Sequence, residues 1–237
     1  MKAMIFAAGL GTRLGKMTTD RPKALADAGG ITLLEAAVAR LAAAGFNDII
    51  INVHHFAGMV REKAESLNSG GLTISISDET DRLLDTGGGL FRARHFFDDK
   101  PFLLYNVDIV TDLNLDELYS RHLQSGGLAT LAVRHREGDR YLLVDENGML
   151  RGWTSRKNAR TIVTDEELTL NRVAFSGIHV VSPEIFSFMD EGVYSMTGLY
   201  LSLAATKRIN TFLHDGGYWL DAGTPESLER CRNYLGR

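Results

Sequence analysis

The sequence predicts an α/β protein with a mostly parallel central sheet, helices on both faces and an antiparallel insertion. Two patterns indicate this class. Up to about residue 115, short apolar runs alternate with segments of helical periodicity, and beyond residue 116 short strands follow one another. Strand-helix alternation builds a parallel sheet between helices, whereas successive strands form hairpins. We expect one domain over residues 1–237, with halves 1–115 and 116–237.

The first half contains the alternating elements. The expected strands are the apolar runs 3–8, 48–53, 72–77 and 102–106, and the expected helices are 33–44, 55–68 and 88–97. The first helix has the clearest limits: Thr32 and Glu35 have capping-box spacing, and Gly45 offers a C-terminal cap. The order βαβαβαβ therefore predicts parallel strands joined by helical crossovers.

The second half contains the insertion and a return to helices. The expected strands are 129–133, 141–144, 149–153, 173–181 and 209–213, with a hairpin turn at Glu146-Asn147-Gly148. The polar stretch 154–171 indicates a loop or an irregular hairpin. Pro183 starts a short helix, 197–206 forms another, and Pro225 lies in the first turn of a last helix over 225–235.

Composition excludes several classes of protein. The chain has 237 residues, 26 Lys and Arg against 30 Asp and Glu, and one cysteine, Cys231. The net charge of −4 argues against a nucleic-acid partner, which needs a basic face, and a single cysteine cannot form an internal disulfide. The apolar run at the N-terminus is too short for a signal peptide or membrane span. We therefore expect a cytoplasmic protein with no membrane partner.

A glycine loop follows the first strand and predicts phosphate binding. Gly9 and Gly11 would let backbone N–H groups approach phosphate oxygens, and Arg13 and Lys23 would add positive charge. Taken alone, the two glycines fit a tight turn equally well. A dinucleotide fingerprint would need a third glycine where Leu14 stands, and no Gly-Lys-Ser/Thr follows for a Walker-type loop.

Further motifs extend this signal along the chain. They are Gly9-Leu10-Gly11-Thr12-Arg13-Leu14, Pro22-Lys23-Ala24-Leu25, Asp85-Thr86-Gly87-Gly88-Gly89, Asn106-Val107-Asp108, Phe175-Ser176-Gly177-Ile178 and Trp219-Leu220-Asp221-Ala222-Gly223-Thr224. In this order they resemble the motifs of the sugar-1-phosphate nucleotidyltransferases, most of all the short N-acetylmuramate-1-phosphate uridylyltransferase-like members. The resemblance implies a Rossmann-like three-layer sandwich of the nucleotide-diphospho-sugar transferase type. It also implies a nucleotide-binding half over 1–115 and a sugar-phosphate-binding half over 116–237.

The resemblance assigns the charged residues to phosphate chemistry. It implies that Arg13 holds the triphosphate and that Lys23 contacts the reacting phosphates, because two anions must be brought together. It also implies a Mg²⁺ cofactor held by Asp108 and Asp221. Magnesium prefers one or two carboxylates with phosphate oxygens and water, so a complete protein cage is not expected. Outside this context, each aspartate fits a loop cap or turn residue.

The resemblance also names residues for recognition of the base, the ribose and the sugar, and each of them has a structural alternative. The resemblance places the nucleotide beside Ala8, Gly9, Gly11, Thr12, Arg13, Glu79, Gly87 and Asn106, and the sugar phosphate beside Lys23, Trp153 and Gly177. Each has a structural alternative: Gly87 fits a glycine-rich helix start, Asn106 a turn, and Trp153 the core of the insertion. Arg151, Arg156 and Lys157 could meet a carboxylate on the sugar or form a solvated face.

The expected reaction joins a nucleoside triphosphate, UTP in the first interpretation, to a sugar 1-phosphate, N-acetylmuramate 1-phosphate in the first interpretation. The products are a nucleotide sugar and pyrophosphate. The alternatives are a GTP-dependent mannose- or heptose-1-phosphate guanylyltransferase, and a catalytically silent regulatory homologue that binds nucleotide sugar. A dehydrogenase fits less well, since no ribose-binding acid follows the second strand. A homo-oligomer stays open because the segment 194–203 suits an interface as well as a core.

Overall fold

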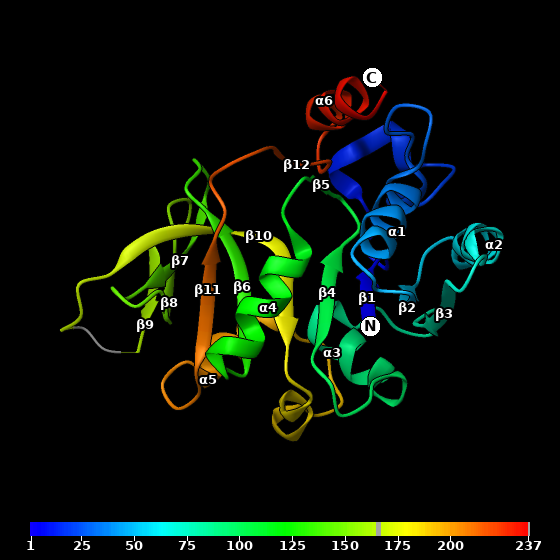
Figure 1. Cartoon of the computed structure of the whole chain (residues 1–237). Coiled ribbons are helices and arrows are strands. Elements are labelled where there is room, and N and C mark those ends of the chain that lie inside the picture. Colours follow the sequence, from blue (N-terminus) through cyan, green and yellow to red (C-terminus); the bar gives the residue numbers. More distant parts are fainter. Residues whose placement is uncertain (165–166, 237) are drawn as a thin grey trace.

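A mixed sheet of ten strands forms the centre of the computed structural model, which describes residues 1–164 and 167–236 (Figure 1). The strand order is β3-β2-β1-β4-β10-β7-β8-β9, and β6 pairs with both β10 and β11. The strands of this sheet are β1 (Lys2–Phe6), β2 (Asp48–Val53), β3 (Thr73–Asp78), β4 (Phe102–Asn106), β6 (Ala129–Arg134), β7 (Arg140–Val144), β8 (Leu150–Ser155), β9 (Arg160–Val163), β10 (Asn171–Val181) and β11 (Ile209–Leu213).

Helices cover both faces of the parallel strands β1 to β4. Successive side chains of a strand point to opposite faces, so Ala3 and Ile5 of β1 join one core and Met4 and Phe6 join the other. The helices that pack on the first core are α1 (Leu33–Ala43), α2 (Ala57–Leu67) and α4 (Leu115–Ser125). The helices on the second are α3 (Asp85–Arg92) and α5 (Met196–Leu203). The molecule is therefore a three-layer α/β sandwich.

Antiparallel strands extend the sheet at the other end. Strand β10 pairs antiparallel with β4, β6 and β7, and β7, β8 and β9 continue as a meander at the left of Figure 1. Two short strands, β5 (Ile109–Thr111) and β12 (Trp219–Asp221), form a separate ribbon. The remaining elements are the 3₁₀ helices η1 (Thr12–Thr18), η2 (Lys23–Leu25), η3 (Ala93–Phe96) and η4 (Pro183–Phe188), and the helix α6 (Pro225–Leu235).

The structure confirms the fold class and corrects several elements. The capping box of α1 is present, and Pro225 begins α6. The first strand ends at Phe6, so residues 7 and 8 belong to the loop. Part of the stretch 154–171 is the strand β9, and the third helix starts at Asp85. The sequence analysis missed α4, β5 and β12, because α4 is mostly polar and strands of three residues show no periodicity.

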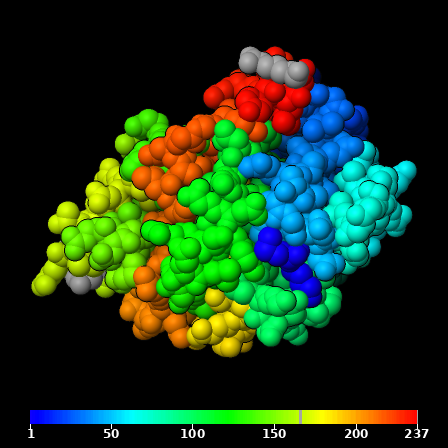
Figure 2. Space-filling model, viewed as in Figure 1, coloured from blue at the N-terminus to red at the C-terminus, as the bar shows by residue number. Residues whose placement is uncertain are grey.

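The C-terminal helix packs on the N-terminal part of the chain. In Figure 2, α6 (red) lies directly over blue residues, and Arg232 Nε donates to the carbonyl of Asp27 over 3.0 Å. Cys231 is fully buried in the small core beneath this helix, as the sequence predicted for a small core residue. Within the described residues, no helix is both long and apolar enough to cross a membrane.

Candidate active site

A cavity of about 530 Å³ opens at the carboxyl ends of β1 and β4. Ligands bind at this end of the strands in open α/β sheets. The cavity brings together most of the side chains and glycines that the sequence analysis assigned to the nucleotide and to catalysis. Its lining includes Ala8, Gly9, Gly11, Thr12, Arg13, Lys23, Glu79, Asn106 and Asp108. Residues from widely separated motifs thus face one space.

A buried network of polar side chains fixes the start of the glycine loop. Asn52 Oδ1 accepts from the N–H of Ala7 over 2.8 Å, and Asn52 Nδ2 donates to Glu79 Oε1 over 2.7 Å. Glu79 Oε2 accepts from the N–H of Leu84 over 3.1 Å, so both carboxylate oxygens have protein partners. Burial raises the pKa of Glu79. Glu79 lines the cavity, and its carboxylate also holds the loop after β1 in place.

The glycines of the loop make room for neighbouring side chains and for a ligand. Gly11 has φ +65°, and a Cβ there would lie 2.9 Å from Lys23 Cβ. A side chain at Gly11 would therefore displace η2, which carries Lys23. A Cβ at Gly9 would meet no atom within 4 Å, so this residue faces open space in the cavity. Bare backbone at this place lets phosphate oxygens approach the N–H groups.

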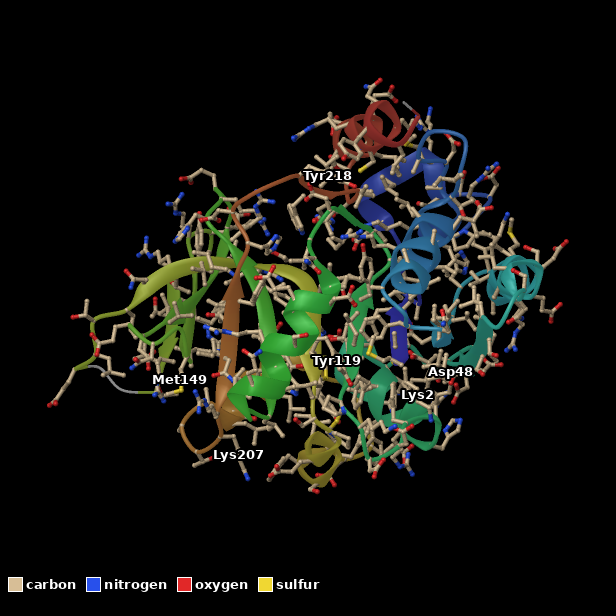
Figure 3. The ribbon with its side chains drawn as sticks, in the orientation of Figure 1. Lys2, Asp48, Tyr119, Met149, Lys207 and Tyr218 are labelled. Carbon is tan, nitrogen blue, oxygen red and sulfur yellow. The ribbon has the colours of Figure 1, made fainter. Side chains whose placement is uncertain are left out.

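The ribbon of β5 and β12 brings the two predicted metal ligands together. Asp108 directly precedes β5, Asp221 ends β12, and the N–H of Ala222 donates to the carbonyl of Asp108 over 2.8 Å. Thr111 Oγ1 donates to the carbonyl of Tyr218 over 2.8 Å and anchors the other end of the ribbon. Tyr218, labelled in Figure 3, lies just before β12 and below α6. Carboxylates from the two halves of the chain thereby share one site.

Positive side chains surround these carboxylates. Lys23 Nζ forms an ion pair with Asp108 Oδ2, and Lys23 is only 8% exposed. Burial and the negative charge of Asp108 raise the pKa of Asp221, while Lys23, Arg13 and Arg136 oppose this rise. The centre therefore combines two carboxylates with three cations, an arrangement that favours binding of phosphate groups.

Gly223 lets Arg13 and Asp221 approach each other. A Cβ at Gly223 would lie 2.7 Å from Arg13 Nη2 and 2.7 Å from Asp221 Oδ1. The glycine is buried and lines the cavity. The bare backbone at residue 223 therefore determines where the guanidinium of Arg13 can lie, and this glycine belongs to the site although the sequence analysis gave it no role.

The carboxylate pair fits a divalent cation. Asp221 Oδ1 is buried and has no hydrogen-bond partner among the described residues, which is the state of an oxygen that a metal would complete. No group of three or more His, Cys, Asp or Glu side chains in the described part of the chain could form a full metal cage. Two carboxylates and free positions for phosphate and water are the pattern of Mg²⁺ sites.

The structure shows what Gly87 packs against, while its expected contact with the nucleotide stays a prediction. This glycine is not among the residues lining the cavity; its N–H donates to the carbonyl of Tyr194 over 2.8 Å, and a Cβ would lie 2.4 Å from the Tyr194 ring. Gly88 similarly faces the carbonyl of Gly192. The segment before α5 packs against Gly87 and Gly88 and leaves no room there for side chains.

Gly177 also lies outside the cavity. Its φ is +78°, and a Cβ would lie 3.0 Å from Asn106 Nδ2 and 2.9 Å from Ile109 Cγ1. Ser176 directly precedes Gly177, and its carbonyl accepts a hydrogen bond from the indole N–H of Trp219, the first residue of β12, over 2.9 Å. This part of β10 therefore supports Asn106 and the ribbon of β5 and β12.

A second cavity, of about 630 Å³, lies over the antiparallel strands, and Asp85 lines both cavities. Trp153 lines the second cavity and also packs on the core. Its position is therefore compatible both with a contact to the sugar and with a role in the core of the insertion. Arg151 and Arg156 form ion pairs with Asp145 and Glu137 and do not line the second cavity.

Arg136 is a site residue that the sequence analysis missed. It lines the second cavity, its guanidinium lies 4.5 Å above the Trp219 ring, and its positive charge acts on Asp221. Its Nε is buried without a hydrogen-bond partner among the described residues, and burial lowers its pKa. One signal was present in the sequence: Arg136 is a basic residue just beyond the apolar run 129–133, and residues at the end of a strand can lie close to a site.

The fold and the site define a phosphate-binding enzyme of the nucleotidyltransferase class, and comparison with known proteins shows the family. The nucleotidyl transferase family model matches residues 2–236, so the chain belongs to that family. It is a sugar-1-phosphate nucleotidyltransferase. This assignment removes the dehydrogenase alternative and favours an enzyme over a silent homologue.

Relatives with known names include two uridylyltransferases. The N-acetylmuramate alpha-1-phosphate uridylyltransferase of Caulobacter vibrioides is 30% identical over 95% of this chain and 93% of its own length. The enzyme of the same name from Neisseria meningitidis is 31% identical over 100% of this chain and 99% of its own length. The mannose-1-phosphate guanyltransferase of Yarrowia lipolytica is 30% identical, and the match spans 62% of that protein.

Solved structures show the same fold. A putative glucose-1-phosphate thymidylyltransferase from Bacillus anthracis, in complex with sucrose, superposes with a TM-score of 0.83 at 18% identity and covers 100% of this chain and 95% of that one. HddC from Yersinia pseudotuberculosis complexed with GMP-PN has a TM-score of 0.78 at 21% identity and covers 99% of both chains.

Proposed function

We propose that this enzyme transfers a uridylyl group from UTP to N-acetylmuramate 1-phosphate in a Mg²⁺-dependent reaction, releasing pyrophosphate. The observation that carries the reaction type is the position of Asp221 beside Asp108, Lys23 and Arg13, three residues that line the glycine-loop cavity. The choice of UTP and of the muramate sugar rests on the two uridylyltransferase relatives, which match the chain over nearly its whole length.

The residues divide into three groups in this proposal. Ala8, Gly9, Gly11, Thr12 and Asn106 border the nucleotide, and Glu79 supports their loop from beneath. Arg13 binds the β- and γ-phosphates and stabilises the charge that develops on the leaving pyrophosphate. Lys23 contacts the α-phosphate, and Arg136 binds the incoming sugar phosphate from the opposite side.

The protein's contribution to catalysis is positioning and neutralisation of charge. The sugar phosphate is already an anionic nucleophile, so no general base is required. Mg²⁺ held by Asp108 and Asp221 would supply further positive charge at the phosphates. Lys23 pairs with Asp108 in the described structure, and we propose that it turns to the substrate phosphates when they bind, a movement that its flexible stem permits.

A guanylyltransferase is the second candidate. Mannose-1-phosphate guanyltransferases match the chain at similar identity, although over less of their own length, and the HddC structure with GMP-PN has the same fold. Base choice depends on a few hydrogen bonds within one cavity. The two candidates therefore differ in the nucleotide and the sugar, while the phosphate chemistry stays the same.

A substrate matrix tests this proposal. Pyrophosphate release is measured with UTP, GTP, CTP, ATP and dTTP against N-acetylmuramate, N-acetylglucosamine, glucose and mannose 1-phosphates, with and without Mg²⁺. We expect the highest kcat/KM for UTP with N-acetylmuramate 1-phosphate and no turnover after chelation. GTP-selective turnover with mannose 1-phosphate would establish the second candidate instead.

The substitution Asp108→Asn tests the metal site. The amide keeps the size of the side chain but removes one negative charge from the pair, so we expect turnover to fall at least 100-fold while the far-ultraviolet circular dichroism stays unchanged. Asp116→Asn, on the exposed part of α4, is the matched control and should change turnover less than twofold. Full activity of Asp108→Asn at ordinary Mg²⁺ would remove Asp108 from the site.

A further inference from the structure

The second cavity presents three arginines around an aromatic floor. Arg136, Arg140 and Arg160 line it, together with Trp153 and Phe175. Asp85 is the one carboxylate among its described lining residues. A pocket with an apolar floor and a few charged groups at its rim binds a small molecule and fixes its orientation. Its net positive charge selects for an anionic ligand.

Strand register explains why two of these arginines point into the cavity. Arg140 of β7 pairs with Ser155 of β8, and Ser155 pairs with Arg160 of β9, so the three residues form one row across the meander. The next row on the same face consists of Leu142, Trp153 and Ile162, which also line the cavity. The backbones of β7 and β9 stand roughly 10 Å apart, a separation that lets both guanidiniums reach one anionic group.

Two arginines of the meander lack ion-pair partners in the described part of the chain, and two others have them. Arg140 and Arg160 have no ion-pair or hydrogen-bond partner for their side chains among residues 1–164 and 167–236. In the same meander, Arg151 pairs with Asp145 and Arg156 pairs with Glu137. Arg140 and Arg160 line the cavity, and no described residue occupies their guanidinium N–H donors.

The second cavity lies beside the cavity at the glycine loop, because Asp85 lines both. Arg136 lines the second cavity and acts electrostatically on Asp221, whereas Arg140 and Arg160 come from strands of the meander. A sugar phosphate whose phosphate meets Arg136 would place its ring over Trp153. The opposite end of the sugar would then face the two unpaired arginines.

We propose that Arg140 and Arg160 bind a carboxylate carried by a ring substituent of the sugar 1-phosphate, and so make the enzyme selective for acidic sugars. The inference rests on the proposed function and deepens it, because it names the residues that select the acceptor. A guanidinium suits this role since its planar N–H groups match the two oxygens of a carboxylate. The phosphate is common to all acceptors, so a second anionic group is what distinguishes an acidic sugar from a neutral one.

Two sugar phosphates provide a direct test. N-acetylmuramate 1-phosphate and N-acetylglucosamine 1-phosphate differ by the ether substituent that carries the carboxylate. KM and kcat for each are measured with the preferred nucleotide in the wild type, in Arg140→Gln, in Arg160→Gln and in the double variant. Arg172→Gln is the matched control, because Arg172 is an exposed residue of β10 in the same sheet and its side chain points to the opposite face.

We expect each single variant to raise KM for the muramate substrate about tenfold, with kcat nearly unchanged and with the glucosamine substrate affected less than twofold. The double variant should lose the preference for the acidic sugar, and Arg172→Gln should keep it. Equal changes with both sugars would indicate a merely structural effect and overturn the inference, as would full preference in the double variant.

A binding measurement distinguishes failure of the proposed reaction from failure of the inference about Arg140 and Arg160. Calorimetric titration of the wild type and the double variant with each sugar phosphate does not depend on turnover. Tighter binding of the muramate compound by the wild type alone supports the inference even if another reaction is catalysed. Equal affinity of the wild type for the two compounds contradicts it, whichever nucleotide the enzyme uses.

Discussion

Asp221 and Gly223 show how single residues build the cluster of carboxylates and cations in the candidate active site. The Asp221 carboxylate is held partly out of water beside a second carboxylate, and both factors raise its pKa. Such an arrangement costs stability and persists where cations compensate for it, here Lys23, Arg13 and Arg136. Gly223 contributes by the absence of a side chain, since it lets a guanidinium approach the carboxylate. Function at this scale depends on contacts that add little to stability.

Gly223→Ala should impair catalysis more than folding. The added methyl group would lie 2.7 Å from both Arg13 Nη2 and Asp221 Oδ1, and the long Arg13 side chain can swing away at little cost. We expect kcat to fall roughly 10- to 100-fold, because Arg13 leaves the position from which, in the proposed function, it binds the triphosphate. Pyrophosphate release and thermal unfolding measure the two effects. Gly58→Ala, inside α2 with open space around it, is the control and should keep full activity.

The ribbon of β5 and β12 is the element that assembles the site. It consists of three residues on each strand and joins the ends of the two halves of the chain. Asp108 precedes one strand and Asp221 ends the other, so the spacing of the carboxylates follows from the pairing of the strands. A ribbon this short depends on side-chain anchors at its far end. Thr111 supplies one, since its hydroxyl donates to Tyr218 and accepts from the N–H of Leu113.

Thr111→Val should loosen the ribbon without touching the substrate. The valine has the same shape but makes neither hydrogen bond, and leaving buried groups unpaired costs about 1–3 kcal/mol. We expect a lower free energy of unfolding in urea and a severalfold higher Mg²⁺ concentration for half-maximal activity. Ser66→Ala, an exposed serine on α2, is the control. An unchanged Mg²⁺ requirement would show that the ribbon does not position the carboxylates.

The whole molecule buries three neutral histidines that the mechanism does not use. Burial lowers the pKa of His122 to about 4, that of His179 to about 3 and that of His214 to about 4. Each ring has a hydroxyl partner: His122 bonds Thr130 and Ser182, His179 bonds Tyr200, and His214 bonds Ser176. These side chains are structural parts of the core, and they make the fold sensitive to acid.

Stability should therefore fall as the pH drops below about 6.5. The unfolded chain takes up protons on these histidines near pH 6.5, whereas the folded protein takes them up only near pH 3 to 4. Their contribution is present above pH 6.5 and is lost on the way to pH 4. Urea unfolding at pH 7, 6 and 5 measures the loss. His122→Gln should flatten this dependence by about one third, and an identical slope in the variant would contradict the assignment.

Local signals made much of the fold predictable. The capping box at Thr32, the apolar runs of β2 and β4 and the proline at the start of α6 are encoded by neighbouring residues. The elements that were missed have weak local signals. Most side chains of α4 are polar. The segments β5 and β12 are strands because they pair with each other. Their structure comes from partners that lie far away in the sequence.

The sequence by itself determined the class of fold, the glycine loop and the identity of the charged residues, because each depends on composition and spacing within one segment. Only the tertiary structure decided what those residues meet. It turned Gly87 toward Tyr194, placed Glu79 beneath the loop, and brought Arg136 to the side of Asp221. The physical reason is that strand register and packing between the two halves set these contacts, and neither can be predicted from neighbouring residues in the sequence.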